Sequence, residues 1–150
     1  MSLRVVTFLP LDTDGAGFVI TRLEAINQLF KFLSPNSQHP IEASDVQEVL
    51  DSGAIALGID EGSSIVGFGL LIPVRKFAGF YAQLEDIVVH PDMRGRGVGE
   101  RICRRLIEVA MAWGVNQIEL TSNPRRLAAR QLYEKLGFKL RETGCYRLTL

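Results

Sequence analysis

The stretch that most constrains the fold runs from Leu84 to Gly99, with the sequence LEDIVVHPDMRGRGVG. An apolar, β-branched run is followed by a short loop and then by three glycines at every second position, Gly95, Gly97 and Gly99. Glycines lack the Cβ atoms that would keep a phosphate away from the backbone, and a helix that begins at Val98 has unpaired N–H groups at its positive end. The stretch therefore predicts a buried strand that leads into a pyrophosphate-binding helix start.

On either side of this stretch, strand-like and helix-like runs follow one another. Turn residues at 61–64 and 75–79 separate three strand-like runs, which predicts an antiparallel meander. The segment 116–121 is expected to run parallel to the strand before the glycine loop, as in a strand–helix–strand unit. In full, strands are expected at 3–9, 54–60, 65–74, 80–89, 116–121, 138–141 and 146–150, the last two as a terminal hairpin, and helices at about 12–33, 44–50, 98–113 and 125–136.

This mixture predicts an α+β (mixed α/β) fold in a single domain over 1–150. The 17 basic and 17 acidic residues balance, so no overall field favours nucleic acid or an anionic membrane. The sequence has no apolar signal core and no run of about 18 apolar residues, so we expect a cytoplasmic protein without a membrane partner. Cys103 and Cys145 lie far apart without CxxC spacing; we expect reduced, mostly buried thiols and no metal site.

Two common nucleotide-binding motifs do not fit the glycine-rich turn. The dinucleotide fingerprint G-x-G-x-x-G has a different spacing and needs an acidic residue after a second strand. The phosphate loop of nucleotide hydrolases needs Lys followed by Ser or Thr, whereas Gly99 is followed by Glu100 and Arg101. What remains is the pattern Arg94-x-x-Gly97-x-Gly99 after a strand that ends in Val-x-Pro.

With this pattern the sequence resembles the GCN5-related N-acetyltransferase (GNAT) superfamily. A second stretch typical of that family, ARQLYEKLGF at 129–138, follows at the right separation, so the two motifs together cover roughly 84–138. The resemblance implies a central, mixed, mostly antiparallel sheet of six to seven strands, flanked by about four helices, with a splay between two parallel strands. It also implies acetyl-CoA as the cofactor and a small-molecule amine as the acceptor. Dimers are common in the superfamily, so a homodimer is one assembly that the resemblance suggests.

In that family the cofactor lies across the splay. The strand backbone around Val88 pairs with the pantetheine arm, the glycine loop wraps the pyrophosphate, and the arginines of the loop add charge towards the phosphates. Asn123 and Arg130 are further candidates, although a helix cap and a solvated side chain would look the same. The cofactor contacts implied are Ile87, Val88, Val89, Arg94, Gly95, Arg96, Gly97, Val98, Gly99, Glu100, Asn123, Arg130 and Tyr133.

The resemblance also implies catalytic roles. Tyr133 matches the position that gives a proton to the departing CoA thiolate, the alternative being a tyrosine that only packs. Glu85 matches the position of the base, acting directly or through water, and the neighbouring Asp86 is the alternative; their side chains point to opposite faces unless a bulge intervenes. A backbone N–H near Val88 is expected to face the developing oxyanion. The acceptor contacts implied are Glu85, Asp86, Phe30 and Tyr146.

The function predicted is therefore transfer of an acetyl group from acetyl-CoA to a primary amine on a small molecule, by direct attack. Two alternatives stay open: acetylation of a protein lysine or N-terminus, and a non-catalytic CoA-binding sensor or interaction module. The scaffold serves many amines, so the sequence does not choose among them.

Overall fold

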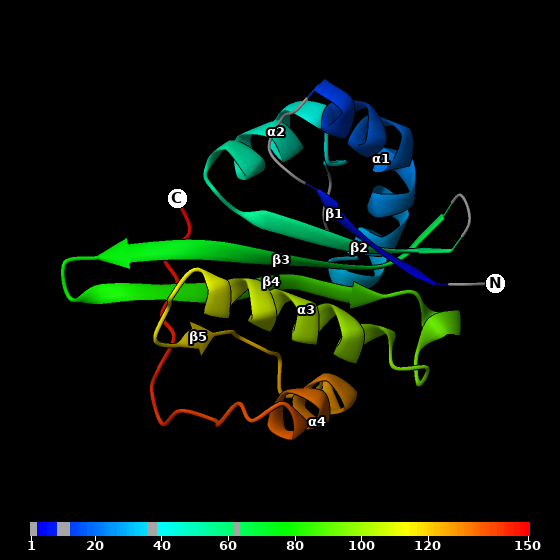
Figure 1. Ribbon diagram of the computed structural model, residues 1–150. Helices are drawn as coiled ribbons and strands as arrows, with labels where there is room; N and C mark the ends of the chain where they lie inside the picture. Colours follow the sequence, from blue (N-terminus) through cyan, green and yellow to red (C-terminus); the bar gives the residue numbers. More distant parts are fainter. Residues whose placement is uncertain (1–2, 9–12, 36–38, 62–63) are drawn as a thin grey trace.

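The structure is a computed structural model that describes residues 3–8, 13–35, 39–61 and 64–150. Its elements are β1 (Arg4–Phe8), α1 (Thr13–Leu33), α2 (Ala43–Asp51), β2 (Ile55–Glu61), β3 (Ser64–Lys76), β4 (Gly79–Val89), the 3-10 helix η1 (Pro91–Met93), α3 (Val98–Ala112), β5 (Ile118–Glu119) and α4 (Leu127–Lys135). The strands form one sheet in the order β1-β2-β3-β4-β5 (Figure 1). The first four pair antiparallel, as the meander predicted, and β5 is parallel to β4.

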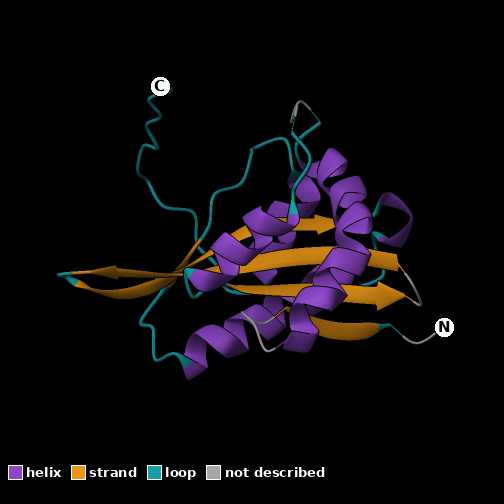
Figure 2. Ribbon diagram, turned by 90° about the horizontal axis from the view of Figure 1, so that it is seen from above, coloured by secondary structure: helices purple, strands orange, loops and turns teal. Residues whose placement is uncertain are grey.

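Helices cover both faces of the sheet. Helices α1 and α2 lie on one face and α3 and α4 on the other, and Figure 2 shows the layers from above. Each face has its own apolar core, and fully burying one such side chain stabilises the fold by about 1.5–3 kcal/mol. Buried members of the core under α3 include Leu57, Leu71, Leu84, Ile102 and Leu106, and those of the core under α1 and α2 include Ile26, Leu29, Leu50, Phe68 and Val88.

Glycines in β3 allow α3 to approach the sheet closely. A Cβ atom at Gly69 would lie 2.6 Å from Cγ2 of Ile102 and 2.7 Å from Cδ1 of Ile87. A Cβ atom at Gly67 would lie 2.7 Å from Cγ1 of Val98, the first residue of α3. The absence of these Cβ atoms lets the first turns of α3 pack directly on β3.

The sheet opens between its two parallel strands, as the resemblance implied. Strand β5 pairs with β4 only at Ala82↔Ile118 and Gln83↔Glu119. Beyond Gln83, β4 continues to Val89 with only β3 beside it among the described strands. The second half of β4 therefore presents an edge without a strand partner, and this edge leads directly into the glycine loop.

Two expectations about the fold are wrong. The sheet has five strands over the described residues rather than six or seven, and residues 139–150 form no strand, so the terminal hairpin is absent. A two-stranded hairpin is marginal by itself, and the two-residue β5 offers little edge to dock it; Leu140 and Leu148 are accordingly exposed. Cys145 lies in this exposed segment, whereas Cys103 is buried as expected.

No helix within the described ranges is both long and apolar enough to cross a membrane.

Candidate active site

A bulge interrupts β4 where the sequence analysis expected the acidic pair. Leu70 pairs with Glu85 and Phe68 with Val88, so two residues of β4 stand opposite one residue of β3. One of these two, Asp86, has φ of 54°, a left-handed conformation that Asp adopts more readily than most residues. Such backbone conformations cluster at functional sites, where the surrounding structure maintains them.

The bulge changes which face each β4 side chain takes. Ala82 and Leu84 pack in the core under α3, and simple alternation would send Val88 to the same core. Val88 packs instead under α1 and α2, while Ile87 and Val89 pack under α3. The simple rule that consecutive residues point to opposite faces therefore fails between Leu84 and Ile87, the stretch that contains Glu85 and Asp86.

Both carboxyl groups at the bulge hold their protons more tightly than usual. Burial raises the pKa of Glu85, the charge of Asp86 raises it further, and a hydrogen bond of 2.8 Å donated by the Gln83 side chain to Glu85 Oε1 opposes the rise. Burial alone raises the pKa of Asp86. A carboxylate with a raised pKa is a better proton acceptor at neutral pH than an ordinary surface carboxylate.

Tyr133 lies on α4 as a neutral phenol. Burial, with smaller contributions from Cys103 and Glu85, raises the pKa of its hydroxyl to about 12, against the opposing charge of Arg126. Its ring packs edge-on against Phe138, with the ring centroids 6.0 Å apart. A phenol with this pKa keeps its proton at neutral pH, as a general acid must.

The glycine loop leaves open space around its backbone. Gly95 and Gly97 have φ of 72° and 77°, and a Cβ atom on either would meet no heavy atom within 4 Å. Gly97 is the N-cap of α3, and no side chain caps it. The first N–H groups of α3 have no partners within the helix, so the loop can hold an anionic group against its backbone.

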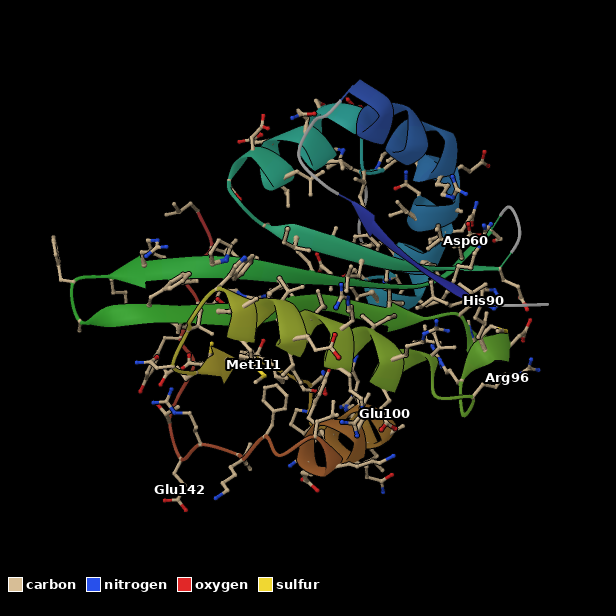
Figure 3. The ribbon with its side chains drawn as sticks, in the orientation of Figure 1. Asp60, His90, Arg96, Glu100, Met111 and Glu142 are labelled. Carbon is tan, nitrogen blue, oxygen red and sulfur yellow. The ribbon has the colours of Figure 1, made fainter. Side chains whose placement is uncertain are left out.

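The structure also places the remaining candidates. Arg94 donates from Nε to the Val89 carbonyl oxygen at 3.3 Å, and Arg96 points away from the molecule (Figure 3). Asn123 Oδ1 accepts a hydrogen bond of 2.9 Å from the backbone N–H of Arg125, which is the turn-capping arrangement. Arg130 is half-buried on α4.

The two acceptor-site aromatics differ in their surroundings. Phe30 is half-buried on α1 and packs edge-on against Phe68, with ring centroids 5.5 Å apart. Tyr146 is 96% exposed in the C-terminal segment. Tyr146 therefore lies in solvent and lines no enclosed acceptor site.

A shallow groove of about 460 Å³ begins at the glycine loop and follows the outer side of α3. It is lined by Gly97, Glu100, Arg101, Arg104, Arg105 and Glu108. Spacings of three and four residues place these side chains on one stripe of the helix. The sequence analysis gave the first two as cofactor contacts and did not include the other four, because exposed charged residues on a helix look the same whether or not a groove lies between them.

Two further residues were missed. The contact between Gln83 and Glu85 could have been predicted, because Gln83 lies two residues before Glu85 and alternate residues of a strand share a face. Arg126, at the start of α4, donates from Nη2 to the Leu33 carbonyl oxygen at 3.0 Å and so ties α4 to the end of α1. Nothing in the sequence marks a contact between residues 93 positions apart.

Comparison with known proteins agrees with this geometry. A family model described as the acetyltransferase (GNAT) family matches residues 23–138. The chain belongs to this family. The superfamily resemblance is thus confirmed.

Relatives with curated names match part of the chain. Thialysine N-epsilon-acetyltransferase of Bos taurus is 36% identical over 83 residues, which are 55% of this chain and 49% of the relative. Probable glucosamine 6-phosphate N-acetyltransferase 2 of Oryza sativa subsp. japonica is 39% identical over 79 residues, 51% of this chain and 46% of the relative. The chain thus spans about half the length of these relatives.

Solved structures match over the whole chain. A Trypanosoma brucei acetyltransferase is 25% identical, with a TM-score of 0.76, 99% of this chain covered and 100% of that chain. An aminoglycoside acetyltransferase from an uncultured soil metagenomic sample is 23% identical, with a TM-score of 0.80, and 100% and 99% of the two chains covered. The second likeness establishes the fold alone.

Proposed function

We propose that this chain is an acetyl-CoA-dependent N-acetyltransferase that acetylates a primary amine on a small molecule. The observation that carries the proposal is the open edge of β4, which has the acidic bulge at one end and the uncapped glycine loop at the other. Relatives in the same family are named for acetylating thialysine, glucosamine 6-phosphate and L-methionine sulfoximine, all of them small molecules.

The residues present fit the cofactor. The unpartnered backbone of β4 around Val88 offers N–H and C=O groups to the amide-bearing pantetheine arm, as an added strand would receive them. The open space at Gly95 and Gly97 admits a pyrophosphate to the first N–H groups of α3. When bound, acetyl-CoA supplies the thioester from which the acetyl group is transferred.

Residues of the chain then accept and donate the protons and stabilise the negative charge that the reaction requires. An alkyl ammonium has a pKa near ~10, so the acceptor must lose a proton before it attacks. Glu85, with its raised pKa, takes that proton at its carboxylate, directly or through water, and Asp86 beside it helps to hold the cationic amine. A backbone N–H near Val88 would face the carbonyl oxygen of the bound thioester, and Tyr133, which keeps its proton at neutral pH, would supply that Oη proton to the CoA sulfur.

A thiol-release assay with acetyl-CoA and a panel of small amines tests the proposal. Tyr133→Phe and Glu85→Gln are each expected to lower kcat by about 10²-fold or more, the usual contribution of a general acid or base. Tyr81→Phe is the matched control for the first, since Tyr81 lies in β4 under Lys76, and Glu134→Gln is the control for the second. Both controls should keep wild-type rates.

The same assay separates the alternatives. Wild-type protein that binds CoA tightly but releases no thiol with any amine would support the sensor function instead. Release only with peptides that carry a lysine or a free N-terminus would support a protein acetyltransferase. Full kcat in Tyr133→Phe would remove the general-acid assignment.

A further inference from the structure

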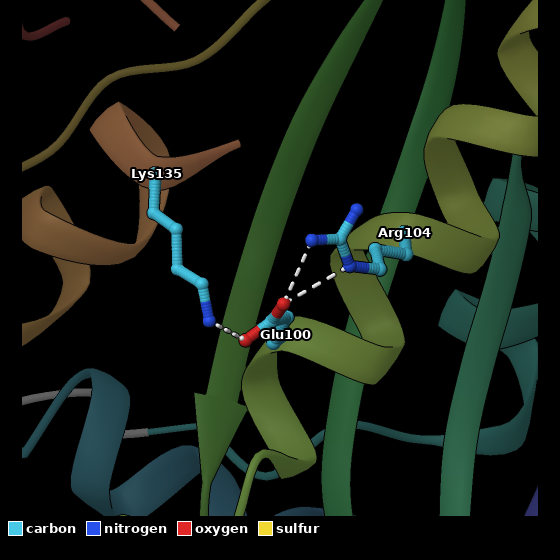
Figure 4. Close-up of polar contacts among 3 residues, drawn as sticks. All are labelled: Glu100, Arg104 and Lys135. Atoms are coloured by element: carbon cyan, nitrogen blue, oxygen red, sulfur yellow. Dashed lines mark hydrogen bonds and ion pairs between the residues drawn. The ribbon is translucent and has the colours of Figure 1, made fainter. Parts of the chain in front are cut away.

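One carboxylate at the start of α3 is shared by two cations. Glu100, in the first turn of α3, accepts a hydrogen bond of 2.6 Å at Oε2 from Lys135 Nζ, at the end of α4 (Figure 4). Its other oxygen, Oε1, accepts two hydrogen bonds from Arg104, at 2.8 Å from Nη2 and 3.0 Å from Nε. Lys135 first and Arg104 second lower the pKa of Glu100, so the carboxylate is charged at neutral pH.

This cluster lies beside the glycine loop. The groove along α3 is lined by Gly97, Glu100 and Arg104 among others, so it connects the uncapped start of the helix with the ion-paired carboxylate. Lys135 reaches the cluster from α4, on the other side of Glu100 (Figure 4). A negative group is favoured at this end of α3 by the helix dipole, and Glu100 now occupies that place.

The two loop arginines that the sequence suggested for phosphate contacts do not point at the start of α3. Arg94 is bonded to the end of β4 and Arg96 points away from the molecule (Figure 3). Lys135 and Arg104 are both more than half exposed, and exposed ion pairs contribute little because water screens them, so their pairing with Glu100 exchanges easily. A phosphate carries more charge than a carboxylate and accepts the same donors.

We infer that Lys135 and Arg104 form a subsite for a phosphate group of the cofactor, and that Glu100 is a built-in competitor that holds both cations until the phosphate displaces it. The inference rests on the proposed function, because it takes CoA as the ligand. It adds two residues to the cofactor contacts and gives Glu100 an opposing role. Glu100 lowers cofactor affinity and keeps the two cations positioned when the cofactor is absent.

Titration calorimetry of the full chain with CoA and with dephospho-CoA tests the inference. Glu100→Gln keeps the size of the side chain and removes its charge, and CoA should then bind about 3- to 10-fold more tightly, with a steeper salt dependence. Lys135→Met removes the ammonium, and CoA should bind about 5- to 10-fold more weakly. A loss confined to CoA identifies the 3′-phosphate as the group bound, and an equal loss for both ligands identifies the pyrophosphate.

Matched controls separate the subsite from general surface charge. Glu119→Gln removes a carboxylate that also pairs with an arginine, Arg141, and that lies on β5 outside the groove. Lys139→Met removes an exposed lysine four residues beyond Lys135. Both variants should bind CoA within about 2-fold of wild type, since neither side chain pairs with Glu100 or lines the groove, and single exposed charges contribute little.

The double variant Glu100→Gln/Lys135→Met decides between direct and indirect action. If Lys135 binds the phosphate, its loss still weakens CoA binding when Glu100 is already neutral. If Lys135 serves only to neutralise Glu100, the loss disappears in that background, and the inference is wrong. Unchanged CoA affinity in Glu100→Gln would also overturn it, whereas a wild-type chain that binds no CoA would overturn the proposed function itself.

Discussion

Gly97→Ala isolates the anion-binding role of the glycine loop from its role in folding. Gly97 has φ of 77°, a left-handed conformation that costs an L-residue roughly 1–2 kcal/mol. The added Cβ would meet no protein atom within 4 Å, so no steric clash adds to this cost. For a chain of this length, a loss of that size lowers Tm by about 2–8 °C. The variant is therefore expected to fold.

Cofactor affinity should fall by more than stability does. The new methyl group projects into the open space where a phosphate approaches the first N–H groups of α3. Loss of one charged hydrogen bond costs about 1.5–3 kcal/mol, so the Kd for CoA should rise about 10- to 100-fold. Titration calorimetry with CoA measures this rise, and thermal unfolding of the same sample measures the change in Tm.

Gly114→Ala is the matched control. Gly114 follows α3 at its opposite end, has φ of 73°, and its added Cβ would likewise meet nothing within 4 Å. Its Tm should fall as much as that of Gly97→Ala, while its CoA affinity stays at the wild-type value. Equal CoA affinity in the two variants would refute the assignment of the glycine loop as the phosphate cradle.

Three other predictions concern charge and packing. Glu85→Gln should raise Tm at pH 7, because a carboxyl whose folded pKa is raised costs stability when ionised; the gain should shrink as pH falls towards the ordinary carboxyl pKa and vanish below it, as thermal unfolding at several pH values would show. Gly69→Ala should destabilise the fold by about 1–3 kcal/mol in urea unfolding, because its Cβ would overlap Ile102 and Ile87; wild-type stability would show that α3 moves away freely. Leu71→Ala should cost about 2–5 kcal/mol by the same measurement, because Leu71 is fully buried, and a smaller loss would mean that the core collapses into the cavity.

The meander, the helix after the glycine loop and the parallel crossover followed from the sequence, because each depends on local apolar spacing and turn residues. The bulge at Asp86 did not, since an extra residue in one strand is defined by its partner strand and leaves no mark on the charge pattern. The terminal hairpin failed for a related reason. Alternation at 146–150 is compatible with a strand, but a strand forms only where a sheet edge is long enough to receive it, and β5 is too short.

Some residues of the candidate site were also predicted from the sequence, and others were not. The glycine loop was found from glycines at fixed spacing, and Glu85 and Tyr133 were implied by the resemblance to the GNAT superfamily; their roles stay predictions. Lys135 was not found, because its contact with Glu100 spans 35 residues and depends on how α4 lies against α3. Contacts between elements are set by packing, which periodicity within each element does not encode.

The two-residue pairing of β5 with β4 has a consequence for how the protein responds to its ligand. A cofactor that lies along β4 would act as the strand that the sheet lacks. The bound ligand would then stabilise the second half of β4, which has a described strand on one side only. Saturating CoA should therefore raise Tm in proportion to the logarithm of its concentration. It should also slow hydrogen exchange at amides of residues 87–89 more than at amides of β2, which already has a strand on each side.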